Sequence, residues 1–127
     1  MTKTVEVILS PAIINALSVT RVVGLAAPPA GFINNILSIS DRVDFGSAAY
    51  TGATTLIFET ADGTNIFTDA ASLPAVADKE SPGLKAQATQ GVMGTTEAFY
   101  ITADGVGASG DSTIYSRITY EQIQIGA

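Results

Sequence analysis

The stretch that most constrains the fold lies near the C-terminus, where two strand-like runs flank a polar loop. Residues 97–122 read EAFYITADGVGASGDSTIYSRITYEQ. In the second run, Ile114, Ile118 and Tyr120 share one face and Tyr115 and Arg117 the other, as expected of a half-buried strand. The loop between the runs consists of Gly, Ser and Asp residues that favour turns. The pattern predicts a β-hairpin with a long polar tip, and an all-β class.

The rest of the chain repeats this pattern in short segments. Val5, Val7 and Leu9 alternate with period two, and Ser10-Pro11 supplies a helix N-cap followed by a proline at the first helical position. Further strands are expected at residues 18–25, 32–45 and 54–60, and the last of these turns at Asp62-Gly63 into a return strand. Short strands at this spacing predict one domain, an antiparallel β-sandwich or small barrel with one short N-terminal helical turn.

Two segments interrupt the regular pattern. Residues 26–31 (AAPPAG) end a strand, because paired prolines cannot donate hydrogen bonds to a sheet. The long run at 32–45 fits no single alternation, which predicts a bulge near Asn34-Asn35. Residues 69–90 contain Pro74 and Pro82 and show no helical face, so we expect irregular structure with one short strand near residues 73–76.

Composition excludes several classes of function. The 127 residues include no cysteine, histidine or tryptophan, which removes disulfides, thiolate chemistry and the commonest nucleophile–base pairs and zinc ligands. Twelve acids against six scattered bases give a net charge of −6, which argues against nucleic acid as a partner. Charged residues make up 14% of the chain, against about 25% in an average soluble domain. We therefore expect a homo-oligomer; the alternative is a well-packed monomer rich in Ala, Ser and Thr.

Nothing in the sequence predicts a membrane partner or export. No segment approaches the roughly 18 continuous apolar residues of a membrane-spanning helix. The first eleven residues, MTKTVEVILSP, alternate like a strand and lack the long apolar block of a secretory signal. We expect the protein to be made and assembled in the cytoplasm.

Carboxylates are the first candidates for catalysis. Asp41 and Asp44 are three residues apart, which on a strand puts them on opposite faces, unlike a glycosidase pair across one cleft. Glu59 and Asp62 flank a predicted turn, where acids are expected for solubility and turn geometry. No pair of environments that would separate two pKa values can be identified, so the sequence predicts a protein that is not an enzyme.

The loop at residues 104–112 has two interpretations. Asp104, Ser109 and Asp111 could supply oxygens to calcium, although their spacing does not match an EF-hand. The interpretation we prefer is a solvated turn, in which Gly and Asp serve the backbone. Gly105, Gly107 and Gly110 match G-x-G-x-x-G, but a strand follows them where a dinucleotide site needs a helix. We predict no metal and no cofactor.

Three segments together resemble small structural proteins of tailed bacteriophages. They are ILSPAIINAL (residues 8–17), SISDRVDFGSAAYTGATTLIFET (38–60) and AFYITADGVGASGDSTIYSRITY (98–120), in the same order as in those proteins. The resemblance implies a virion protein of the capsid decoration or cement type. Such proteins form jelly-roll-like sandwiches, associate as dimers or trimers, and bind over junctions between major capsid protein subunits at the capsid surface. The family has no catalytic residues to carry over.

For that role, we expect capsid or subunit contacts from segments with apolar content and little structure of their own. These are an extended N-terminal arm at residues 1–9, the loop around residues 28–29 and the segment 69–90. The predicted contact residues are Val5, Val7, Leu9, Pro28, Pro29, Leu73 and Pro74. The rival hypothesis is a carbohydrate- or receptor-binding sandwich of a phage fibre, neck or tail, using exposed aromatic residues such as Tyr50 and Tyr115 in a shallow groove.

Overall fold

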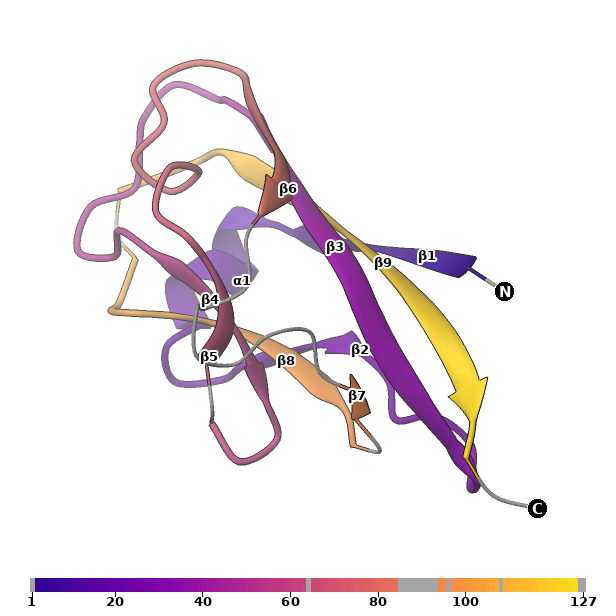
Figure 1. Ribbon diagram of the computed structural model, residues 1–127. Helices are drawn as coiled ribbons and strands as arrows, with labels where there is room; N and C mark the ends of the chain where they lie inside the picture. The colour runs from indigo at the N-terminus through magenta and orange to yellow at the C-terminus, as the bar shows by residue number, and fades with distance from the viewer. Residues whose placement is uncertain (1, 64, 85–93, 96, 108, 126–127) are drawn as a thin grey trace.

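The computed structural model describes residues 2–63, 65–84, 94–95, 97–107 and 109–125. These residues form β-strands and one short helix (Figure 1). In chain order the elements are β1 (Thr2–Leu9), α1 (Pro11–Ala16), β2 (Val22–Leu25), β3 (Phe32–Asp44), β4 (Leu56–Thr60), β5 (Asn65–Asp69), β6 (Lys79–Leu84), β7 (Gly94–Thr95), β8 (Phe99–Ala103) and β9 (Thr113–Gln124).

The strands form two antiparallel sheets that pack face to face. One sheet has the order β1-β9-β3-β6, with the two-residue strand β7 also paired to β3; the other has the order β2-β8-β4-β5. With β7 set aside, four strands lie in each sheet, and the chain crosses between the sheets at nearly every connection. This is the strand order of a jelly roll. The structure confirms the predicted antiparallel sandwich and selects it over a small barrel.

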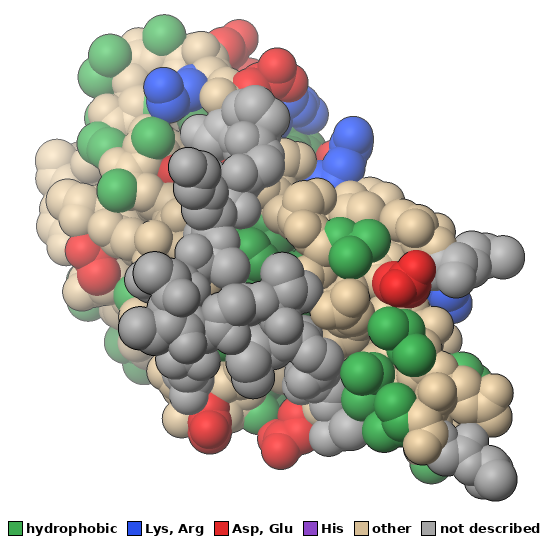
Figure 2. All heavy atoms as spheres, viewed as in Figure 1, with side chains coloured by type: hydrophobic (Ala, Val, Ile, Leu, Met, Phe, Trp, Pro, Cys, Tyr) green, Lys and Arg blue, Asp and Glu red, His purple; other side chains and the backbone are tan. Residues whose placement is uncertain are grey.

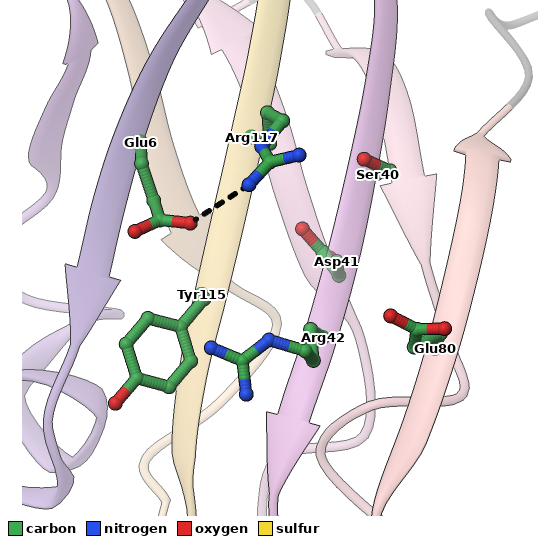
Figure 3. A pocket seen from close by; sticks show the side chains of 7 residues that line it. All are labelled: Glu6, Ser40, Asp41, Arg42, Glu80, Tyr115 and Arg117. Atoms are coloured by element: carbon green, nitrogen blue, oxygen red, sulfur yellow. Dashed lines mark ion pairs between the residues drawn. The ribbon is translucent and has the colours of Figure 1, made fainter.

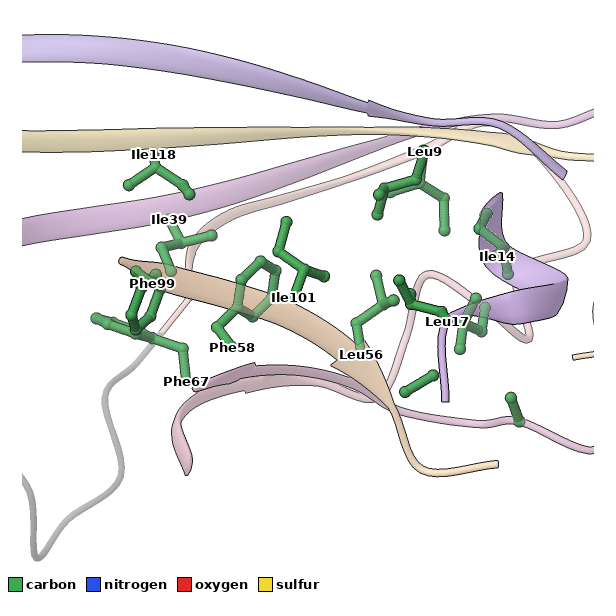
Figure 4. Close-up of a cluster of buried hydrophobic side chains, with 14 of the residues drawn as sticks. Leu9, Ile14, Leu17, Ile39, Leu56, Phe58, Phe67, Phe99, Ile101 and Ile118 are labelled. Atoms are coloured by element: carbon green, nitrogen blue, oxygen red, sulfur yellow. The ribbon is translucent and has the colours of Figure 1, made fainter. Parts of the chain in front are cut away.

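The core lies between the two sheets, and alternation along each strand fills it (Figure 4). Phe58 of β4 and Ile101 of β8 approach from one sheet, and Ile118 of β9 from the other, all fully buried. Burying each such side chain contributes about 1.5–3 kcal/mol. The predicted helical turn is confirmed: the Ser10 side chain accepts a hydrogen bond from the Ile13 amide, and Ile14 is buried against the core.

The expected N-terminal arm is a strand that is paired along its whole length. β1 pairs with β9 at every position from Thr2, opposite Glu121, to Leu9, opposite Ile114. It forms one edge of its sheet. Its alternation therefore reflects a half-buried edge strand rather than a segment waiting for a partner.

The predicted C-terminal hairpin is wrong, although both of its strands exist. β8 lies between β2 and β4 in one sheet, and β9 lies between β1 and β3 in the other. Residues 104–112 therefore cross from sheet to sheet. Period-two alternation shows which face of a strand is buried, but it does not show which strand lies beside it. Among the described strands, β4 and β5 alone are consecutive and paired, around a turn with Gly63 at φ 89°.

The predicted bulge in the run 32–45 is confirmed, and another prediction needs correction. The register of β3 against β9 shifts between Ile36 and Ser38, just after Asn34-Asn35. Residues 73–76 form turns and bends instead of a strand, with Leu73 buried in the core. The backbone carbonyl of Leu73 is held by the amide of Tyr50 at 3.2 Å, from a different connection. Residues 85–90 of the same predicted segment lie outside the described residues.

Candidate interaction surfaces

One end of the sandwich gathers the connections β3–β4, β5–β6 and β8–β9, and we call it the loop end. It lies at the upper left in Figure 1. Asp111 joins two of these connections: its Oδ1 accepts hydrogen bonds from the amides of Ser47 at 2.7 Å and Ala48 at 2.9 Å. Its Oδ2 accepts from the Ser47 hydroxyl at 2.6 Å. These bonds, led by that from the Ser47 side chain, lower the pKa of Asp111.

Asp104 does the same at the other side of the β8–β9 connection. Its Oδ1 accepts from the amides of Thr54 at 2.9 Å and Thr55 at 3.1 Å, and its Oδ2 accepts from the Thr54 hydroxyl at 2.8 Å. The bonds from Thr55 and Thr54 lower the pKa of Asp104. Both carboxylates thus accept hydrogen bonds from neighbouring loops, as expected if these aspartates serve to stabilise turns. Among the described residues, no group of three or more His, Cys, Asp or Glu side chains could hold a metal ion.

Tyr50 closes the loop end from inside. Its side chain is only 4% exposed, and its hydroxyl donates to the Ser112 carbonyl at 2.5 Å. A Cβ on Gly110 would lie 2.2 Å from the Tyr50 ring, so the glycine is required for this packing. Burial, followed by the nearby charge of Asp111, raises the pKa of Tyr50 to about 12. Tyr50 is therefore a core residue and not the groove aromatic of the carbohydrate-binding hypothesis.

A shallow hollow of about 140 Å³ lies on the outer face of the β1-β9-β3-β6 sheet (Figure 3). The Arg42 guanidinium lies over the ring of Tyr115, 4.1 Å from its centroid. Arg117 pairs with Glu6 at 3.5 Å, and Glu80 lies on the far side of Arg42. Two arginines and two glutamates balance in charge, and one face of Tyr115 is covered by Arg42. Arg42 therefore already occupies one of the two ring faces of Tyr115, the second aromatic residue of the carbohydrate-binding hypothesis.

The prediction that Asp41 and Asp44 lie on opposite faces is confirmed, but Asp41 has a different carboxyl neighbour that no pattern in the sequence indicates. Asp44 is exposed, whereas Asp41 is 2% exposed and faces the core. There its Oδ1 accepts a hydrogen bond from the Ser116 hydroxyl at 2.6 Å, and the carboxyl next to it is that of Asp69, also 2% exposed. Asp69 ends β5 in the opposite sheet. Both carboxyls are thus almost fully withdrawn from solvent, although Asp41 is also among the residues that line the hollow.

The opposite end of the sandwich carries exposed apolar residues. Ile33 of β3 is paired with Ile123 of β9, so both lie on one face. The pairing continues where the Ile125 amide donates a hydrogen bond to the Gly31 carbonyl at 2.8 Å. Ile123 is 37% exposed and Ile125 is 59% exposed. Figure 2 shows hydrophobic side chains gathered at the lower right, over this end of the two strands. We call Ile33, Ile123 and Ile125 the ribbon-tip patch.

The structure separates the seven predicted contact residues. Leu9 and Leu73 are fully buried, so their side chains are unavailable to a partner in this fold, which corrects that part of the prediction. Of the others, Pro29 and Pro74 are exposed and Pro28 is partly exposed, whereas Val5 and Val7 are partly buried against the core. Of these, Pro28 and Pro29 lie beside the ribbon-tip patch, since the Pro29 carbonyl accepts from the Phe32 amide at 3.1 Å.

Comparisons with known proteins bear on the fold. No protein-family model matches the chain, and no curated protein matches it. A chain from the cyanophage Pam1 capsid asymmetric unit superposes with a TM-score of 0.54 at 16% identity, covering 94% of this chain and 82% of that one. At this identity the likeness shows the fold. A chain described with Bacillus endospore appendages, disulfide-linked pili, has a TM-score of 0.42 at 10% identity, covering 99% of this chain and 88% of that one, and carries no argument. In the described part of the chain, no helix has the length and apolar character to cross a membrane.

Proposed function

We propose that this chain is a non-enzymatic virion structural protein of the capsid decoration or cement type. In this proposal it binds at the capsid surface over junctions between major capsid protein subunits and stabilises the shell. The observation that carries the proposal is the jelly-roll fold shared, over 94% of the chain, with a chain from a cyanophage capsid asymmetric unit. The sequence resemblance to phage structural proteins, found independently of the fold, supports the same role.

The chemistry of the described residues supports a binding role over a reactive one. Asp104 and Asp111 hold loops, Glu59 pairs with Arg21 at 2.8 Å, and Asp41 is sealed in the core. Each of these four carboxyls therefore has a structural role or a buried position. A protein that cements a shell needs a rigid body and a contact surface, since many weak contacts repeated over a closed shell add up to a large total.

We assign the contact with the shell to the ribbon-tip patch and the adjoining loop at Pro28-Pro29. This surface is apolar, exposed and built on two long paired strands, whereas the loop end is occupied with its own hydrogen bonds. Apolar surface of this kind gains most when a partner removes it from water. A homo-oligomer, either a dimer or a trimer, belongs to the same proposal.

The test is binding of the purified protein to particles that have been stripped of it. The variant Ile123→Ser/Ile125→Ser removes the exposed apolar groups while leaving the strand pairing in place. The matched control Val19→Ser/Val106→Ser removes two side chains, 83% and 60% exposed, from elsewhere on the surface. We expect the wild type and the control to bind the particles and to raise the temperature at which they release DNA. The ribbon-tip variant should do neither.

The two parts of the proposal fail differently. If the wild-type protein does not bind any particle of the virus that encodes it, the cement function is wrong. If the ribbon-tip variant binds as well as the control, the function stands and the assigned contact surface is wrong.

A further inference from the structure

The two sheets meet at a pair of buried carboxyls. Asp41 projects from β3 in one sheet, and Asp69 from the end of β5 in the other, and each is 2% exposed. The two side chains face each other across the core, within reach of a hydrogen bond when one of them carries a proton. Two acids in a sealed site are costly, because an ionised carboxylate without compensation is strongly disfavoured away from water.

The donors around the pair show how the charge is distributed. Asp69 receives hydrogen bonds on both oxygens: Oδ1 from the amides of Ala71 at 2.9 Å and Ser72 at 3.1 Å, and Oδ2 from the Ser72 hydroxyl. Hydrogen bonds to both oxygens favour the ionised form of Asp69. Asp41 receives one bond on Oδ1 from Ser116, while its buried Oδ2 has no donor among the described residues. A proton on Oδ2 would turn this orphaned acceptor into the donor of the bond to Asp69.

No cation among the described residues neutralises the pair. The nearest basic residues in sequence, Arg42 and Lys79, belong to the outer surface: Arg42 lies over Tyr115, and Lys79 is exposed. Glu80, next to Lys79 on β6, is exposed as well. From β9, the group that faces Asp41 is the neutral Ser116, and from the turn after β5 it is Ser72 beside Asp69. The pair must therefore hold its negative charge at one rather than two by binding a proton.

We propose that a single proton shared between Asp41 and Asp69 fastens the two sheets together, so that the fold weakens as rising pH removes this proton. The site would thus make the jelly roll a proton-dependent structure, most stable in weak acid. This inference does not depend on the proposed function, and its test needs no particle or partner.

The direction in which stability changes with pH follows from the altered pKa values of Asp41 and Asp69. Burial, followed by the hydrogen bond to Asp69, raises the pKa of Asp41 to about 9. Burial alone would raise the pKa of Asp69, but the hydrogen bonds from Asp41, Ser72 and Ala71 lower it. From about pH 4, where an unfolded aspartate loses its proton, up to about pH 9, the folded chain binds one proton that the unfolded chain does not. Stability therefore falls as pH rises through this window. Below it, Asp69 takes up a proton and stability falls again.

The experiment measures unfolding by urea between about pH 5 and pH 9, a window in which no histidine or cysteine of this chain can titrate. For the wild type, the unfolding constant should rise with pH, with a limiting slope of about tenfold per unit. In Asp41→Asn the amide can donate to Asp69 and accept from Ser116, so this variant should lose the slope and exceed the wild type at pH 9. Asp44→Asn, on the exposed face of the same strand, should behave like the wild type.

A measurement on the wild type alone guards against a variant that fails to fold. The infrared band of a protonated, buried carboxylic acid should be present at neutral pH and disappear as the pH passes about 9. Absence of this band at neutral pH, or an Asp41→Asn variant with the same slope as the wild type, would overturn the proposal. Restoration of wild-type stability at high pH by sodium or calcium would also overturn it, because the pair would then hold a cation in place of a proton.

Discussion

The two ends of this jelly roll are built in contrasting ways. At the loop end, the side chains of Asp104, Asp111 and Tyr50 bind the connections to one another, and Gly110 is packed against an aromatic ring. At the opposite end, the tips of β3 and β9 project with Ile123 and Ile125 exposed to solvent. Side-chain hydrogen bonds there include those from Asn34 to the Ala26 carbonyl at 3.1 Å and from Gln122 to Asn34 at 3.4 Å.

The two ends differ in how far their side chains are already used by contacts within the fold. Side chains that satisfy hydrogen bonds inside the loop end contribute to the stability of the fold and are not free to bind anything else. The ribbon-tip patch contributes little to the core, and its exposed apolar area would gain from being covered by a partner. Residues of the loop end therefore maintain the fold, whereas the residues of the ribbon-tip patch are exposed and can contact a partner.

The largest expected effect is at the loop end. Gly110→Ala places a Cβ 2.2 Å from the buried Tyr50 ring, which must move. We expect a loss of about 3 kcal/mol in the free energy of unfolding, typical of overpacking in a rigid site. Urea denaturation measures it. The control is Gly63→Ala in the β4–β5 hairpin. A Cβ added there meets no atom within 4 Å apart from its chain neighbours, so only the positive φ of 89° opposes the change. There we expect a loss of about 1 kcal/mol, and equal losses at the two glycines would contradict the packing argument.

A smaller effect is expected from the two loop-anchoring carboxylates in acid. Their pKa values are lowered by hydrogen bonds from Thr55 and Thr54 at Asp104 and from Ser47 and Ala48 at Asp111. Such groups stabilise the fold above the usual aspartate range and lose this contribution as pH falls through the lowered values. The variant Asp104→Asn/Asp111→Asn should be less stable than the wild type near neutral pH and should lose less on acidification. Melting temperatures at about pH 7 and pH 3 measure both, and parallel losses in the two proteins would count against the anchoring role.

The smallest effect on stability is expected at the ribbon tip. Ile123→Ser/Ile125→Ser should change the free energy of unfolding by less than about 0.5 kcal/mol per site, as surface substitutions usually do. The same denaturation assay provides the measurement. A loss as large as that for Gly110→Ala would show that the tip belongs to the core, and the contrast between the two ends would disappear.

Local features of the fold were readable from the sequence. Ser10-Pro11 predicted the start of the helix, Asp62-Gly63 predicted the hairpin, and alternation predicted the faces of β1 and β9. These are short-range properties of turns and strand periodicity. The assignment of β8 and β9 to different sheets could not be read, because Asp104-Gly105 signals a turn without specifying whether the strands it joins will pair.

The candidate sites were harder to predict than the fold. The pairing of Asp41 with Asp69 depends on two strands from different sheets meeting in the core, and no spacing in the sequence encodes it. Tyr50 and Leu73 lie in segments with no regular pattern, so their burial follows from long-range packing alone. Pro28 and Pro29 break a strand, and the structure adds what the sequence could not show: Gly31, in the turn that follows them, accepts a hydrogen bond from the Ile125 amide.

The central claim, that this chain is a repeated component of a virus shell, is tested most directly by counting it. Quantitative mass spectrometry of purified particles of the virus that encodes it gives the number of copies relative to the major capsid protein. We expect a fixed, simple ratio of this chain to the major capsid protein, because a closed symmetric shell sets the number of equivalent binding sites. Absence from the particle, or presence in only a few copies as expected of a neck, tail or fibre component, would contradict it.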